Sequence, residues 1–165
     1  MKTHSTIVIL LFSTLIYSQD LIEIKRIDSI VASINNSGIK PHYDTIKQNF
    51  STAGLSTTIC LAMLVDSGKL KRFENQVFAT VTENGISKKT TTSSIFYYNQ
   101  NKLIKVHESI SEEGKEDGQA DWYYSDEKPI YYTLKNERAE ERSILLVQIS
   151  KAMIAKARSI GVITQ

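Results

Sequence analysis

Apolar positions recur at helical spacing at both ends of the chain. Near the start, the apolar positions of residues 21–34 are three or four apart, which predicts a helix that Gly38 stops. Residues 137–159 predict a long C-terminal helix that Gly161 ends. One face of this second helix is marked by Ile144, Leu145, Gln148, Ala152 and Ala155. The stretch PHYDTIKQNF, residues 41–50, suggests a short additional helix.

Between the helices, apolar and polar residues alternate with the period of two that is typical of β-strands. The runs are short and separated by polar turns. They predict an antiparallel meander of about six strands, at residues 57–65, 69–82, 88–98, 102–110, 119–125 and 129–135. A sheet of this kind needs one covered face, and the long C-terminal helix is the natural cover. The predicted fold class is α+β.

Three hairpins of this meander resemble one another: residues 62–75, 95–108 and 121–134. Gly68 and Asn101 hold the last turn position in the first two, where a positive φ is commonly needed. Glu127 is poor at that position, which predicts a different turn in the third hairpin. Pro129 predicts that the last strand lies at an edge of the sheet. The likeness reflects either duplication or the few turn solutions that hairpins allow.

The N-terminus has the pattern of a secretory signal peptide. Lys2 precedes an apolar run over residues 6–17, and Ser18 is a small residue at the expected cut. The run is too short to span a bilayer as a helix, so no stable membrane span is predicted once the signal is removed. We expect a signal peptide at 1–18, a single α+β domain at 19–165, and a periplasmic or secreted protein.

The charge of the mature chain is nearly balanced, with 19 basic and 18 acidic residues after Lys2 is lost. A domain that binds nucleic acid is usually strongly basic, so we expect no nucleic-acid partner. The lone cysteine, Cys60, lies in an apolar run and cannot form an internal disulfide. We expect it to be a small buried apolar residue.

Aromatic residues are concentrated in three neighbouring predicted strands: Tyr97, Tyr98, Trp122, Tyr123, Tyr124, Tyr131 and Tyr132. Adjacent tyrosines on a strand face opposite sides of a sheet, so one set would be exposed or covered by a partner. An exposed tyrosine face suits partner or ligand binding. The alternative is cross-strand aromatic pairing that only stabilises the sheet.

Strand 102–110 carries a histidine beside a glutamate. Alternation places Leu103, Lys105, His107 and Ser109 on one face and Ile104, Val106, Glu108 and Ile110 on the other. His107 and Glu108 therefore point to opposite sides and cannot act as a base and its orienting carboxylate. Lys105 and His107 are expected to face solvent. The candidate binding residues are Tyr97, Tyr98, His107, Trp122, Tyr124 and Tyr131.

No motif for catalysis, metal or cofactor binding is recognised. Asp117, Asp121, Asp126 and Glu127 lie near turns, but the ligand spacing of an EF-hand is missing. The nucleophile elbow and the phosphate loop are also missing. We therefore predict no catalytic residue, no metal site and no cofactor.

The leader that ends in YSQ and the turns DSGKL and NQNKL resemble those of small uncharacterised secreted proteins of Bacteroidetes-type bacteria. EDGQADWYY is similar to one unit of a MORN-type repeat, although the glycine of the following turn is missing. Neither resemblance implies an activity.

These features favour an exported, non-enzymatic binding or interaction module of the bacterial envelope, with the tyrosine-rich sheet face as its contact surface. The alternative is a carrier of a small apolar ligand, because a long helix across an antiparallel sheet resembles the helix-grip architecture. An enzyme ranks third. The partner would be a protein or a small apolar ligand.

Overall fold

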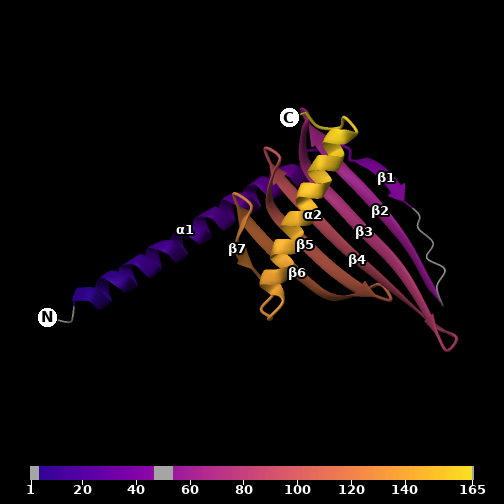
Figure 1. Cartoon of the computed structure of the whole chain (residues 1–165), viewed down its shortest axis with the longest axis horizontal. Coiled ribbons are helices and arrows are strands. Elements are labelled where there is room, and N and C mark those ends of the chain that lie inside the picture. Colours follow the sequence, from indigo (N-terminus) through magenta and orange to yellow (C-terminus); the bar gives the residue numbers. More distant parts are fainter. Residues whose placement is uncertain (1–3, 47–53, 165) are drawn as a thin grey trace.

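The computed structural model describes residues 4–46 and 54–164 and has the predicted α+β architecture (Figure 1). Its sheet is antiparallel, and the strands lie side by side in chain order. The elements are α1 (His4–Asn35), β1 (His42–Ile46), β2 (Leu55–Asp66), β3 (Lys69–Glu83), β4 (Ile86–Asn99), β5 (Lys102–Glu112), β6 (Lys115–Ser125), β7 (Lys128–Tyr132) and α2 (Ala139–Ser159). The six predicted strands correspond to β2–β7.

The sheet has one strand more than predicted. Residues 42–46, which we expected to begin a short helix, form β1 and pair with β2 from His42 opposite Met63 to Ile46 opposite Ile59. The backbone pairing offered by the edge of β2 outweighs the weak helical signal of this stretch. The rest of the predicted helix, residues 47–50, lies outside the described residues.

All five hairpins between β2 and β7 have two-residue turns in which both residues have a positive φ. This is the geometry that matches the right-handed twist of the flanking strands. The expectation of a different third turn was wrong, because Asp126 and Glu127 adopt φ values of 47° and 63°. The third turn is therefore held in a strained conformation for two residues with side chains. Pro129 lies in β7, an edge strand, as predicted.

The three similar hairpins also share a bulge just after the turn. The second strand of each has one extra residue, and the register shifts there: Val65 pairs with Leu70, Tyr98 with Leu103, and Tyr124 with Pro129. A bulge changes which face the following residues occupy. Leu103 consequently shares a face with Val106, and Ile104 shares the other with Lys105. Simple alternation had assigned Leu103 and Ile104 to the wrong faces.

Helices cover both faces of the sheet near the hairpin tips (Figure 1). The C-terminal part of α1 packs on one face, called the α1 face, through Ile27, Val31 and Ile34. The other, called the α2 face, is crossed by α2. Among the helices of the described residues, none is both long and apolar enough to cross a membrane.

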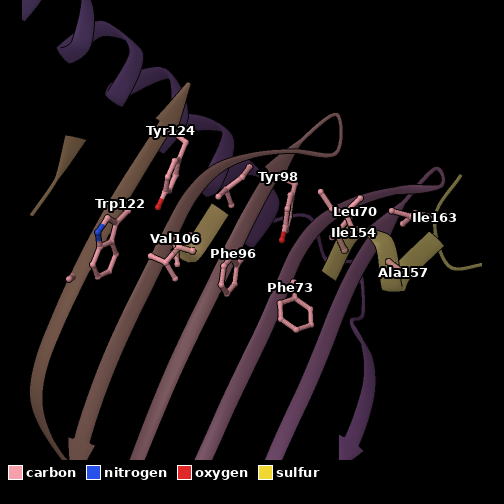
Figure 2. Packing of buried hydrophobic residues seen from close by; sticks show 13 residues of the cluster. Leu70, Phe73, Phe96, Tyr98, Val106, Trp122, Tyr124, Ile154, Ala157 and Ile163 are labelled. Carbon is pink, nitrogen blue, oxygen red and sulfur yellow. The ribbon is translucent and has the colours of Figure 1, made fainter. Parts of the chain in front are cut away.

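The α2 face carries the largest buried side chains: Trp122, Tyr98, Tyr124, Phe73 and Phe96 (Figure 2). The side of α2 that meets them is made mostly of small residues: Ala139, Ser143, Leu146, Ser150, Ile154 and Ala157. Large rings on the sheet leave room only for small side chains on the helix, because interiors are close-packed. The stripe that we marked from sequence, from Ile144 to Ala155, is instead exposed on the outer side of α2.

Candidate functional site

An open cleft lies on the α2 face where α2 begins. Its volume is about 380 Å³, within the range of small-molecule sites. Strands β5 and β6, the segment after β7 and the first turn of α2 supply its walls. The apolar lining comes from Ile110, Gly118, Ala120, Trp122 and Leu134, and the polar lining from Glu108, Asn136, Arg138 and Arg142, among others.

An ion pair fixes the helix to the sheet at one side of the cleft. Arg142 donates from Nε to Oε2 of Glu108 at 3.0 Å, and a second nitrogen of its guanidinium donates to Oε1. Ser94 donates its hydroxyl to the same Oε1 at 2.9 Å. The Glu108 carboxylate raises the pKa of Arg142, and partial burial opposes this. Both carboxylate oxygens of Glu108 thus accept hydrogen bonds, although this charged residue lies on the core face of the sheet. The ion pair with Arg142 gives this side of the cleft a fixed shape.

A glycine leaves space in the wall of the cleft. Gly118 lies in β6 opposite Ile110, and a Cβ built on it would meet no atom within 4 Å. Its φ is not in the left-handed region, so the backbone does not require glycine there. Glycine within a strand often marks a bulge or the close approach of a ligand or another backbone. The pairing of β5 with β6 does shift here, because Asp117, directly before Gly118, is an extra residue. The empty space above Gly118 belongs to the cleft.

Trp122 forms a deep part of the same wall. Its side chain is buried, and its indole nitrogen has no hydrogen-bond partner among the described residues. Figure 2 shows this nitrogen on the side of the ring away from Val106. A buried indole usually finds an acceptor, so an unpaired one beside a cleft is unusual. Trp122 is also the only tryptophan of the chain, so its fluorescence reports on this cleft.

The three charged side chains that line the cleft, Glu108, Arg138 and Arg142, sum to a charge of +1. Glu108 and Arg142 neutralise each other, and Arg138, just before α2, has no ion pair with any residue that the structure describes. No side chain caps the N-terminus of α2, where Arg138 stands at the cap position. The positive end of the helix dipole adds to the guanidinium charge, and Glu140 and Glu141 in the first turn oppose it. This part of the cleft can bind an anionic group.

A polar network lies on the α1 face and joins α1 to the sheet. Lys105 Nζ donates to Tyr123 Oη at 2.7 Å and to Asp28 Oδ1 at 3.0 Å, and Tyr123 donates to the same Asp28 oxygen at 3.0 Å. Asp121 Oδ2 is 3.7 Å from Lys105 Nζ. Desolvation lowers the pKa of Lys105, but these partners outweigh it and the net pKa is raised.

His107 belongs to this network and not to a pair with Glu108. Its Nδ1 lies 2.8 Å from Asp121 Oδ1, on the strand next to it. The prediction that His107 and Glu108 face opposite sides is confirmed, since Glu108 bonds Arg142 on the α2 face. The expected solvent exposure was wrong for Lys105, whose side chain is only 12% exposed. The bulge and α1 together cover this part of the strand.

The structure buries most of the predicted aromatic binding residues. Tyr98, Trp122 and Tyr124 lie beneath α2, and Tyr97 lies beneath α1. The prediction that these side chains form an exposed binding face is therefore wrong. Tyr131 is 42% exposed and stacks obliquely against Tyr123, with ring centroids 5.9 Å apart. The sequence alone could not show which tyrosines are exposed, because it does not reveal that a helix covers each face of the sheet.

Of the candidates from sequence, the cleft contains only Trp122. The positions that sequence reasoning missed are Gly118, Leu134, Arg138 and Arg142. Gly118 gave no signal, because it directly precedes the predicted strand at 119–125, whereas β6 begins at Lys115. The two arginines gave no signal, since basic residues near a helix end are common.

Comparisons with family models, with curated proteins and with solved structures found no match to this chain.

Proposed function

We propose that this chain is an exported binding protein that holds a small apolar ligand with an anionic group in the cleft between β5, β6 and the start of α2. The observation that carries the proposal is the space above Gly118 in a cleft walled by Trp122. An apolar cleft with a few convergent polar groups has the usual character of a small-molecule site. The leader sequence supports export.

The chemistry of the cleft suggests the orientation of the ligand. Ile110, Ala120 and Leu134 offer apolar contact, and Arg138 offers a charge that no described residue neutralises. We place the apolar part of the ligand over Gly118 and its anionic group at Arg138. A guanidinium binds a carboxylate through two parallel hydrogen bonds, which makes this pairing directional.

The test uses dodecanoate as the probe and dodecanol as its uncharged counterpart. Binding is followed by the fluorescence of Trp122, because no other tryptophan contributes to the signal. We expect saturable binding of dodecanoate and weaker binding of dodecanol. If neither probe binds, the proposal is wrong; if both bind equally, Arg138 does not select the charge.

Two variants locate the binding. Gly118→Val adds a side chain that fills the space in the cleft, and we expect at least about tenfold weaker binding of dodecanoate. Ser56→Val is the control, because Ser56 is an exposed residue of strand β2 that lies outside the lining of the cleft. Arg138→Gln should weaken dodecanoate and leave dodecanol unchanged. Equal effects of the two valine variants would contradict a site at Gly118.

A further inference from the structure

The outer side of α2 carries an apolar stripe that no described part of the chain covers. Ile144 is 53% exposed and Leu145 is 42% exposed, and Gln148, Ala152 and Ala155 continue the same side of the helix. In Figure 1, α2 lies across the near face of the sheet with no helix or strand in front of it. A helix with an apolar outer side normally has a further packing partner.

Charges of opposite sign are concentrated at the two ends of α2; between them, Lys151 is paired with Glu127. Glu140 and Glu141 lie in the first turn, and Lys156 and Arg158 lie in the last. None of these four side chains has an ion pair with any residue in the described ranges. The two ends of the helix are thus electrostatically complementary to each other but are about 30 Å apart within one chain.

We propose that the outer side of α2 is the interface of a homodimer in which two α2 helices pack antiparallel about a twofold axis near Gln148. In such an isologous contact, the same surface of both copies is used. The acidic end of one helix then meets the basic end of the other, at both ends of the interface.

The sizes of the apolar side chains fit the same arrangement. With the axis at Gln148, Ile144 of one helix lies opposite Ala152 of the other, and Glu140 lies opposite Lys156. A large residue opposite a small one lets two helices approach closely and interdigitate. A parallel pairing would instead place large against large and like charge against like charge. The stripe therefore favours a second copy of this chain as its partner.

The arrangement of charges has a second effect, because acidic residues at the start of a helix and basic residues at its end also stabilise that helix alone. A change in the free energy of unfolding therefore cannot test the proposal. The quantity to measure is the dissociation constant of the dimer. Sedimentation equilibrium of the full chain should give a concentration-dependent dimer. A chain that stays monomeric at concentrations well above the micromolar range overturns the proposal, as does a larger assembly without a dimer.

Two variants test the apolar stripe. Ile144→Glu should weaken the dimer by at least about tenfold. Ile86→Glu is the matched control, because Ile86 is an isoleucine even more exposed than Ile144 and lies next to the distal turn between β3 and β4. Equal weakening by both variants would show that association is nonspecific and would overturn the proposal.

A charge exchange tests the antiparallel orientation. One variant carries Glu140→Lys and Glu141→Lys, so both ends of its α2 are basic. The other carries Lys156→Glu and Arg158→Glu, so both ends are acidic. Each alone should be monomeric, and their mixture should form a one-to-one heterodimer. Dimers of either variant alone, or no heterodimer from a wild-type chain that dimerises, would exclude this geometry.

Discussion

His107 and Asp121 lie opposite each other on β5 and β6, with Nδ1 of the histidine 2.8 Å from Oδ1 of the aspartate. The neighbour of His107 in sequence, Glu108, bonds Arg142 on the other face of the sheet. Strand β5 therefore connects to both helices through charged groups, to α1 through Lys105 and to α2 through Glu108. Each helix is anchored by contacts that only the folded sheet brings together.

Lys105 is expected to stabilise the packing of α1. Lys105→Met removes the donor shared by Tyr123 and Asp28 and should lower the free energy of unfolding by about 1.5–3 kcal/mol, the range for hydrogen bonds to charged groups. Urea denaturation followed by circular dichroism measures this change. Lys102→Met is the control, because Lys102 pairs with Asp126 on the exposed surface and should have little effect. Equal effects would mean that the network does not hold α1.

Two buried tyrosines at equivalent hairpin positions should respond differently to loss of the hydroxyl. Tyr124 donates to the carbonyl of Ser143 at 3.1 Å, so Tyr124→Phe should cost about 0.5–1.5 kcal/mol. The hydroxyls of Tyr98 and Ser150 are both buried and have no hydrogen bond of ordinary geometry. Tyr98→Phe should therefore leave stability unchanged or raise it. Urea unfolding monitored by Trp122 fluorescence compares the two variants, and a larger loss for Tyr98→Phe would be the contrary result.

Stability is expected to fall at alkaline pH. Burial raises the pKa of Tyr98 and Tyr124 above the ordinary value of 10.0. The folded state then binds these protons more tightly than the unfolded state, so the contribution of the two tyrosines to stability is constant below about pH 10 and declines above it. The raised pKa of Lys105 acts in the same direction. Unfolding free energies at successive pH values test this, and Tyr124→Phe should make the decline less steep. A decline that begins near neutral pH would need another cause.

Glycine in place of Glu127 should stabilise the third hairpin turn. Glu127 has a φ of 63°, a conformation that costs a residue with a side chain about 1–2 kcal/mol. Glu127→Gly should therefore stabilise the protein by about 1 kcal/mol relative to Glu127→Ala. The alanine variant is the proper reference, because both substitutions remove the ion pair with Lys151 at 2.9 Å. Thermal unfolding of the two variants measures the difference, and equal stability would show that the turn relaxes.

The hairpin meander was predictable from sequence because its signals are local. Alternating residues define each strand, and two-residue turns such as Ser67-Gly68 and Asn84-Gly85 specify how the strands connect. Both helices and the edge position of β7 also followed from local patterns. Strand β1 did not, because its pairing partner lies across a long connection and the strand itself is short.

The tertiary structure decided which faces are buried and where the cleft lies. One extra residue after each of four turns shifts the register, and the shift after the turn between β4 and β5 moves Leu103 to the α2 face. The alternation of apolar and polar residues in the sequence does not reveal such a bulge. The large rings of the sheet select the small-residue side of α2 for packing, which leaves Ile144 and Leu145 outside. Gly118 and Arg138 come together only because β6 ends in a hairpin that returns the chain to the start of α2. Local periodicity therefore determined the elements, and packing between elements distant in sequence determined the surfaces available for binding.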